Sequence, residues 1–224
     1  MNTIKNTKVK CYTTVILDRS GSMCNNRQET VDEFNNQLAI AKEQTELDMC
    51  MSLVTFSYGV DKAQYWLEPV NSIEPMVLDD YQPDGNTSLL DAIGFTLTKL
   101  RIETEPSSKH LVFIISDGQE NASREYNGPS IKKLLTEFNE DKRWTITYFG
   151  CNIDALTLER DYGIAHGNHQ VFASMSGPTG AHGNSGSSGR AVSSRAYYNN
   201  VSRGVTVDSF YGTTAGGATN GQSQ

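Results

Sequence analysis

The sequence predicts an α/β fold: a doubly wound, Rossmann-like, mostly parallel sheet of six strands, with one antiparallel edge strand and helices on both faces. Two observations lead to this prediction. Strand and helix signals alternate along most of the chain, which is typical of parallel sheets with crossover helices. The connection over 57–62 is only six residues long and cannot hold a crossover helix, so the strands it joins should be antiparallel.

The first half of the chain supplies three of these strands and two helices. The strands are expected over 9–17, 51–56 and 63–70, the last of them at an edge. One helix should begin near Asn26 and another after Ser88, because Glu29 and Asp91 follow these residues at capping-box spacing. The expected apolar faces are Val31, Phe34, Leu38 and Ala41 in the first helix and Leu90, Ile93, Leu97 and Leu100 in the second.

The second half continues the alternation. Strands are expected over 110–116, 144–149 and 170–173. Pro129 suits the first turn of a helix that should run to about Glu140, and another helix is expected over 153–162. The inward side of the helix at Pro129 should carry Ile131, Leu134, Leu135 and Phe138.

The length of 224 residues allows one α/β domain with a sizeable core and is short for two. We expect an N-terminal extension over 1–7, the domain over 8–173 and a C-terminal region over 174–224. Within that last region, 177–189 is rich in Gly and Ser and should form a flexible loop, 191–202 could form a final helix, and 212–224 should be disordered.

Charge and cysteine content narrow the function classes. The net charge of −7 argues against general affinity for nucleic acid or an anionic membrane, which are bound chiefly through Lys and Arg. No apolar stretch at the N-terminus has signal-peptide length and none reaches transmembrane length, so a cytoplasmic protein is expected. The cysteines are too sparse for a disulfide framework and should be free thiols: Cys11, Cys24, Cys50 and Cys151.

Oxygen donors gather where two predicted strands end. Asp18, Ser20 and Ser22 follow the apolar run over 15–17 on one tight turn, and Asp117 follows the strand over 110–116. Thr87 lies in a loop between these two in the sequence. The carboxyl ends of parallel strands meet at one rim of a doubly wound sheet, and hard oxygen ligands suit Mg²⁺ better than Zn²⁺. The alternative is that Asp18 and the serines only shape a turn and cap a helix.

This arrangement resembles the metal-ion-dependent adhesion site (MIDAS) of the von Willebrand factor type A (vWA) family, whose pattern is Asp-x-Ser-x-Ser, then a distant Thr, then a distant Asp. The resemblance covers roughly 8–173 and implies strand order 3-2-1-4-5-6. It implies that Ser20 and Ser22 bind Mg²⁺ directly, with Mn²⁺ or Ca²⁺ as other candidates. Thr87 would bind directly or through water, and Asp18 and Asp117 largely through water and hydrogen bonds.

Three further segments resemble small stand-alone vWA proteins of bacteria and their phages, including those near tellurium-resistance systems. These segments are 89–94, 117–126 and 149–155. The subgroup's own function is poorly defined, so this likeness indicates the fold better than the biological role.

The expected function is Mg²⁺-dependent binding of a partner protein, without catalysis. An ion held directly by neutral hydroxyls is incompletely neutralised and keeps a water-occupied position, which attracts an external carboxylate. In related vWA domains an Asp or Glu of a partner protein fills that position, and we expect the same here. A membrane partner is not expected, and nucleic acid is disfavoured by the charge.

Two other functions stay open at this point: a Mg²⁺-dependent hydrolase or phosphatase, and a phage or virion assembly protein. Phosphatases of the haloacid dehalogenase type need a second Asp two residues after the first, where this chain has Ser20. The chain contains no phosphate-binding loop motif and no nucleophile elbow. Cys24 lies beside the expected site but has no identifiable His base.

Three other groups of residues give weaker indications of a binding site. His166 and His169 could chelate a metal, but no Cys or carboxylate is beside them in the sequence, so a solvated loop is expected. Glu120 and Asn121 could tune ligand choice at the rim or simply open a surface loop, which is favoured. A C-terminal group could hold single-stranded nucleic acid, or dock on the domain's own acidic surface as a regulatory or assembly element: Arg190, Arg195 and Arg203, with Tyr197 and Tyr198.

Overall fold

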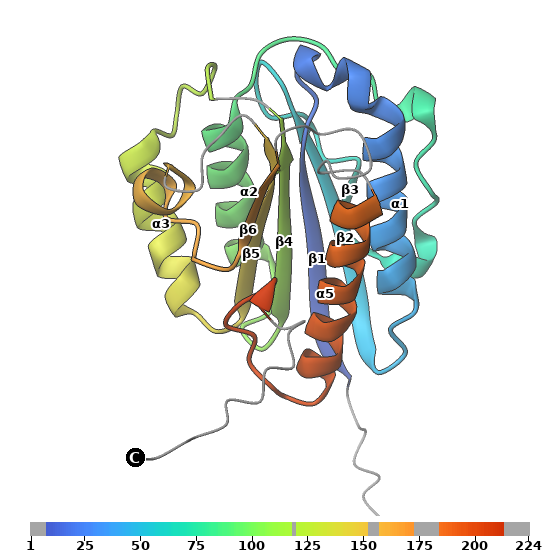
Figure 1. The fold of residues 1–224 in the computed structure, drawn as a ribbon. Coiled ribbons are helices and arrows are strands. Elements are labelled where there is room, and N and C mark those ends of the chain that lie inside the picture. Colours follow the sequence, from blue (N-terminus) through green and yellow to red (C-terminus); the bar gives the residue numbers. More distant parts are fainter. Residues whose placement is uncertain (1–7, 118–119, 152–156, 173–183, 213–224) are drawn as a thin grey trace, which may run out of the picture.

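The computed structural model of the chain describes residues 8–117, 120–151, 157–172 and 184–212. Six strands form one sheet in the order β3-β2-β1-β4-β5-β6 (Figure 1). All neighbouring strands are parallel except β3, which runs antiparallel to β2 at one edge. The strands are β1 (Val9–Asp18), β2 (Leu47–Phe56), β3 (Tyr65–Pro69), β4 (Lys109–Ser116), β5 (Trp144–Cys151) and β6 (His169–Phe172). The predicted fold class and strand order are confirmed.

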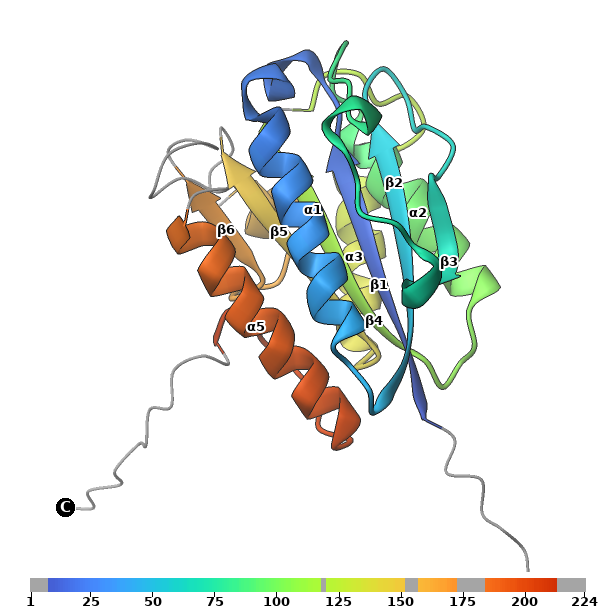
Figure 2. The same ribbon diagram turned by 90° about the vertical axis from the view of Figure 1, so that its right-hand side faces the viewer.

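Helices cover both faces of this sheet. The long helices are α1 (Arg27–Lys42), α2 (Leu89–Glu103), α3 (Gly128–Glu140) and α5 (Asn184–Ser202). Shorter helical segments are η1 (Gly21–Asn26), η2 (Val70–Ser72), η3 (Leu78–Asp80) and η4 (Leu158–Tyr162). Helices α1 and α5 lie side by side on one face, and α2 and α3 lie on the other (Figures 1 and 2). None of the helices in the described ranges is long and apolar enough to cross a membrane.

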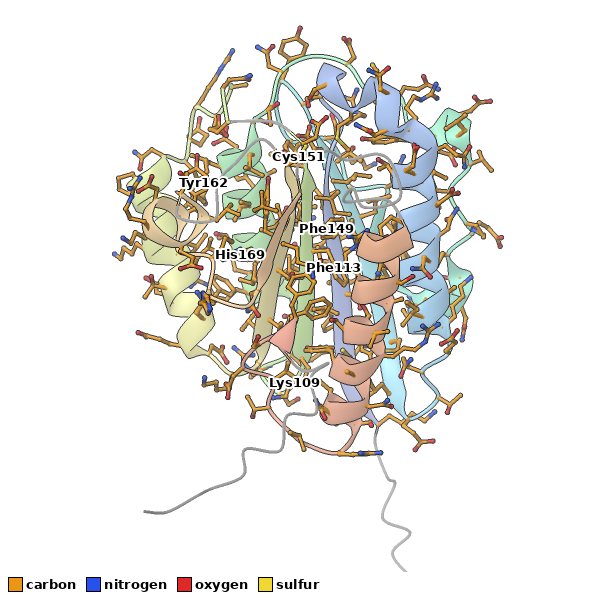
Figure 3. All side chains as sticks on the ribbon, in the orientation of Figure 1. Lys109, Phe113, Phe149, Cys151, Tyr162 and His169 are labelled. Carbon is orange, nitrogen blue, oxygen red and sulfur yellow. The ribbon has the colours of Figure 1, made fainter. Side chains whose placement is uncertain are left out.

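Strand β4 carries a continuous apolar run because it lies in the centre of the sheet, with a core on each face. Leu111, Phe113 and Ile115 belong to the core under α1 and α5, whereas Val112 and Ile114 belong to the core under α2 and α3. Successive side chains of a strand point to opposite faces, so a strand covered on both sides must be apolar at every position. Figure 3 shows Phe113, together with Phe149 of β5, on the face that α5 covers.

The structure corrects the expected helix starts. Neither Asn26 nor Ser88 makes a side-chain cap hydrogen bond, so the two predicted capping boxes are wrong. Helix α1 follows directly from η1, and Glu120 Oε2 accepts the hydrogen bond of the Leu90 amide at 2.9 Å. Spacing alone cannot reveal a carboxylate that arrives from a distant loop. A capping box does form at α3, between Asn127 and Ser130, with Pro129 in the first turn as expected.

The C-terminal region differs most from its expectation. Helix α5 begins at Asn184, inside the segment predicted to be a flexible loop, and continues through the predicted final helix. Ser187 Oγ donates a hydrogen bond to Glu33 of α1 at 2.7 Å, so contact with the domain stabilises residues that are weak helix formers alone. Expectations that lie outside the described residues are the loop over 177–183, the tail over 213–224 and the helix start over 153–156.

Candidate metal centre

The first loop of the candidate site holds Asp18 in a fixed orientation. Asp18 is fully buried at the end of β1. Its Oδ1 accepts a hydrogen bond from the Ser20 amide at 2.7 Å, and its Oδ2 accepts one from Ser116 Oγ at 2.5 Å. The Tyr81 hydroxyl donates to the Asp18 carbonyl oxygen at 2.5 Å. Both carboxylate oxygens therefore already have protein partners, and the side chain has one available orientation.

A chain of hydrogen bonds joins the remaining donors of the first and third loops. The Oγ atoms of Ser20 and Ser22 are 3.0 Å apart, and Ser22 Oγ donates to Asp117 Oδ1 at 2.6 Å. Ser20 and Asp117 are buried, whereas Ser22 is exposed at the rim. Hydroxyl and carboxylate oxygens from residues 95 positions apart thus converge at the surface.

The second loop, which carries Thr87, is tied to both of the others through the backbone. The Gly21 amide donates to the Gly85 carbonyl at 3.0 Å. On the other side, the Thr87 amide donates to Asn121 Oδ1 at 2.9 Å, and the Asn121 amide donates back to the Thr87 carbonyl at 3.0 Å. Thr87 itself is 3 % exposed. Within the described ranges it is linked to the other donors by these loop contacts and not by a direct hydrogen bond.

These five residues, Asp18, Ser20, Ser22, Thr87 and Asp117, are called the oxygen cluster below. They come from three loops at the rim where β1 and β4 end; Figure 3 shows the same rim near Cys151, at the end of β5. All five were expected at this rim from the sequence, and the structure brings four of them into one hydrogen-bonded group.

Burial of the two carboxylates shapes the electrostatics of the cluster. Burial raises the pKa of Asp18 to about 6, although the hydrogen bonds from Ser116 and Ser20 act to lower it, and the charge of Asp117 adds to the rise. Burial likewise raises the pKa of Asp117 against the lowering effect of the Ser22 hydrogen bond. No Lys, Arg or His of the described residues forms an ion pair with Asp18. Burial thus disfavours the ionised form of both carboxylates, and a cation bound at the cluster would stabilise that form.

The spacing of the two serines fits octahedral coordination. Two neighbouring ligands of a Mg²⁺ ion bound at about 2.1 Å are separated by about 3.0 Å, because the edge of an octahedron is √2 times that distance. The Ser20 and Ser22 Oγ atoms are 3.0 Å apart. Asp117 Oδ1 lies nearer to Ser22 Oγ than Ser20 Oγ does, at 2.6 Å. This distance suits a carboxylate that accepts a hydrogen bond from Ser22 and does not itself bind the ion. The donor set and this spacing fit Mg²⁺.

Sequence reasoning missed how the third loop is held in place. Asp91 Oδ1 and Oδ2 accept hydrogen bonds from the amides of Arg124, Glu125 and Tyr126 at 2.8–3.0 Å. Glu120 accepts from the Leu90 amide on α2 and from Ser123 Oγ at 2.7 Å. Glu120 thus fastens this loop to α2 and Asn121 fastens it to Thr87, so the two residues do not simply open a surface loop. Asp91 was the available sequence signal, but its capping-box spacing assigned it to the start of α2 and not to the third loop.

The aromatic residues of the C-terminal region are not available to stack on nucleic acid. Tyr197 and Tyr198 are 2 % and 0 % exposed, and the Tyr198 hydroxyl is 2.7 Å from Thr13 Oγ1 of β1. Arg190 forms a buried ion pair with Glu33 at 2.7 Å, and Arg195 pairs with Glu43 at 3.1 Å. Base stacking is therefore wrong for Tyr197 and Tyr198, and Arg190 and Arg195 dock on acidic residues of their own domain. Arg203 is exposed.

Comparisons with known proteins identify the fold. Neither the models of known protein families nor the curated proteins contain a match to this sequence. Among solved structures, a von Willebrand factor type A protein from Catenulispora acidiphila matches with a TM-score of 0.55 and 11% identity over 84% of this chain. Proximal thread matrix protein 1 from the mussel byssus matches with a TM-score of 0.53 and 15% identity, also over 84%. The SpRpn10 VWA domain matches with a TM-score of 0.53 and 12% identity over 71%.

The fold of this chain is therefore that of vWA domains. The match covers 46% of the mussel protein and 43% of the Catenulispora protein, so this chain spans less than half of their lengths. It covers 85% of the SpRpn10 domain.

Proposed function

We propose that this chain is a protein-binding module whose recognition depends on a divalent metal ion at the oxygen cluster. The observation that carries the proposal is the hydrogen-bonded series Ser20, Ser22 and Asp117, which brings oxygen donors from two loops together beside buried Asp18, with the two serine Oγ atoms at octahedral spacing. The vWA fold supports the placement of such a site at the carboxyl ends of the strands.

In this proposal each residue has one role. Ser20 and Ser22 would be direct ligands of Mg²⁺, with Mn²⁺ or Ca²⁺ as substitutes, and Thr87 would bind directly or through water. Asp18 and Asp117 would act mainly through water and hydrogen bonds, which agrees with the two protein donors already placed on Asp18. The bound ion would supply a Lewis-acidic position open to an external oxygen.

We further propose that the partner presents Asp or Glu to this position. Exposed Ser22 leaves the cluster open to a side chain from outside, and hydroxyl ligands leave the ion with attraction for a carboxylate. A cytoplasmic adaptor related to the small bacterial and phage vWA proteins is the biological setting we propose. All four cysteines are free, which suits a reducing compartment.

The proposal includes no catalysis by this chain. Cys24 is exposed and its Sγ lies 3.5 Å from the Pro83 carbonyl, a contact that does not activate a thiol. The position two residues after Asp18 is Ser20, which offers no second carboxylate to a phosphoryl group. Release of phosphate from p-nitrophenyl phosphate by the purified chain in Mg²⁺ would contradict this part of the proposal.

Calorimetric titration of Mg²⁺ and Mn²⁺ into the purified chain tests the metal site. Ser22→Ala removes one direct ligand from an exposed position, so binding should fall below detection while the circular dichroism spectrum stays unchanged. Ser72→Ala is the matched control, because Ser72 is also exposed and bonds only a local carbonyl. Equal metal affinity in the two variants would overturn the assignment of the site.

The partner is then sought by capture from lysate in Mg²⁺ and in EDTA. We expect a protein that is retained by the wild type in Mg²⁺ and lost with EDTA or Ser22→Ala. Replacement of the partner's acidic residues one at a time should identify a single Asp or Glu whose removal abolishes binding. Capture that is unaffected by chelation and by Ser22→Ala would contradict a metal-mediated contact.

A further inference from the structure

Glu159, His166 and His169 meet on the surface at the β6 edge of the sheet. Both imidazoles hydrogen-bond the same carboxylate oxygen: Glu159 Oε1 is 2.9 Å from His166 Nδ1 and 2.7 Å from His169 Nε2. All three atoms lie within 4.8 Å of one another. The sequence pattern had left the two histidines without a neighbouring carboxylate, and the fold supplies one from η4.

We propose that these three residues, called the edge cluster, form a second metal site that binds Zn²⁺. Two imidazole nitrogens and one carboxylate oxygen are a donor set that Zn²⁺ accepts in tetrahedral sites, with the fourth position left to water or an external ligand. Ligand atoms bound to a tetrahedral Zn²⁺ at about 2.0–2.1 Å are about 3.4 Å from one another. Shifts of each of the three ligand atoms by about 1 Å or less would therefore accommodate the ion. A carboxylate only accepts hydrogen bonds, so each facing nitrogen now carries a proton, which the metal would displace to the other ring nitrogen.

The backbone around the edge cluster is already fixed, which reduces the ordering cost of binding. Leu158 and Ile164 are 1 % and 3 % exposed in the core under α2 and α3, and the Ile164 amide donates to the Leu158 carbonyl at 2.9 Å. Gly163, whose φ is +78°, turns the chain between the end of η4 and Ile164, and its carbonyl accepts a hydrogen bond from Asn139 of α3. Glu159 therefore projects from a short segment anchored on both sides.

The histidines are held in a similar way. Buried Asn168 precedes His169, its carbonyl accepts the Tyr148 amide of β5 at 2.8 Å, and its Oδ1 accepts the Phe210 amide at 2.7 Å. His169 begins β6 and is 10 % exposed at its side chain, whereas His166 is 91 % exposed. Figure 3 shows His169 away from the rim where Cys151 lies. One ligand is thus rigid and partly covered, and another is open to solvent.

The two proposed sites should differ in metal preference. Imidazole nitrogen is a borderline donor that favours Zn²⁺, Co²⁺ or Cu²⁺, whereas the oxygen cluster favours Mg²⁺. Excess Mg²⁺ should therefore occupy the oxygen cluster and leave the edge cluster to Zn²⁺. A Zn²⁺ ion at the edge cluster would cross-link η4 to the edge strand β6 and stabilise this side of the sheet.

Zn²⁺ titration of the full chain in excess Mg²⁺, in competition with a chromophoric chelator, tests the proposal. We expect one Zn²⁺ per chain, and at least about 100-fold weaker binding in His166→Ala, His169→Ala and Glu159→Gln, since loss of even an outer-sphere partner costs 10- to 100-fold. Ser22→Ala should bind Zn²⁺ as the wild type does, which separates this site from the oxygen cluster. His182→Ala, at a position outside the described residues, is the control for adventitious histidine binding.

Two further readouts complete the test. Co²⁺ in place of Zn²⁺ should give the strong visible d–d bands of a four-coordinate site in the wild type, and lose them in His166→Ala. Zn²⁺ should raise the Tm of the wild type but not that of His166→Ala, whose exposed position leaves the fold unaffected. Unchanged Zn²⁺ affinity in His166→Ala or Glu159→Gln would overturn the proposal, as would an equal loss in His182→Ala.

Discussion

Single residues at the ends of the strands set the geometry of the oxygen cluster. Gly150 of β5 pairs with Ser116 of β4, and a Cβ atom at Gly150 would lie 1.8 Å from the Ser116 carbonyl oxygen. Ser116 in turn donates the hydrogen bond that orients Asp18. The absence of a side chain at Gly150 is therefore needed for β5 to approach the residue that positions the candidate metal site.

Replacement of Gly150 tests this link. Gly150→Ala should lower the free energy of unfolding by about 1–3 kcal/mol, because the added methyl group overlaps backbone atoms, and should weaken Mg²⁺ binding through displacement of Ser116. Gly189→Ala in α5 is the matched control: its Cβ meets nothing within 4 Å, and it should stabilise the helix by about 0.5–1 kcal/mol. Denaturant unfolding and calorimetry measure both effects. Equal stability of the two variants would contradict the tight approach at Gly150.

His110 is a buried histidine in the core that should make the protein sensitive to acid. Its ring stacks on Trp144 at 3.6 Å between centroids and on Tyr12 at 5.3 Å. Burial lowers the pKa of His110 to about 3, and the charge of Arg143 adds to this. The unfolded chain takes up this proton near pH 6.5, so the folded state loses stability as the pH falls from about 6.5 toward 3.

His110→Phe keeps an aromatic ring but removes the titrating group. Between pH 6 and pH 4 the wild type should lose about 1.4 kcal/mol per pH unit more than this variant, the slope for one proton bound only by the unfolded state. Urea unfolding at several pH values measures the difference. Parallel pH dependence of the two proteins would show that His110 is protonated in the folded state.

At the scale of elements, the contact between α1 and α5 holds α5 against the domain. Glu33 and Arg190 are both fully buried and form an ion pair at 2.7 Å, and the Arg190 guanidinium lies 4.0 Å from the Phe149 ring centre. Burial acts to raise the pKa of Glu33, but Arg190 holds it below its usual range. Gln37 and Ser194 extend the polar contact with a hydrogen bond at 2.7 Å.

A double-mutant cycle tests how this pair specifies the docking of α5. Arg190→Met alone should cost about 3–5 kcal/mol of unfolding free energy, because it leaves the Glu33 carboxylate buried without its partner. The double variant Glu33→Leu, Arg190→Met should recover most of that loss. The exposed pair of Arg195 and Glu43 is the control, and Arg195→Ala should cost less than about 1 kcal/mol. Additive costs in the buried pair would contradict direct coupling.

At the scale of the whole molecule, bound metal should couple to global stability. A ligand that binds only the folded state stabilises it by about 2.7 kcal/mol when present at 100 times its Kd. EDTA should therefore lower the Tm of the wild type relative to Mg²⁺, whereas the Tm of Ser22→Ala should be the same in both. Differential scanning calorimetry measures this. A Mg²⁺-dependent Tm in Ser22→Ala would place the bound ion elsewhere.

The periodic signals in the sequence predicted the sheet well. Strand and helix alternation, the continuous apolar run of β4 and the short 57–62 connection each have one local physical cause, and each of the six predicted strands was found. Of the helix predicted over 153–162, the described residues show the short segment η4. The rim position of Asp18 and Asp117 followed for the same reason, because strand ends place their next residues at one edge. Element limits were less accurate: β2 begins at Leu47, paired with Val9 of β1, and not at 51.

The sequence by itself determined the order of elements, the sheet class and the residues of the oxygen cluster, because these depend on periodicity and on positions next to strand ends. Only the tertiary structure decided the start of α5, the partner of Arg190 and the meeting of Glu159 with His166 and His169. Each of these depends on a polar contact between segments that no local pattern connects. For Glu33 and Arg190, burial also removes water as the alternative partner, so their contact overrides the weak helix propensity of the segment that carries Arg190.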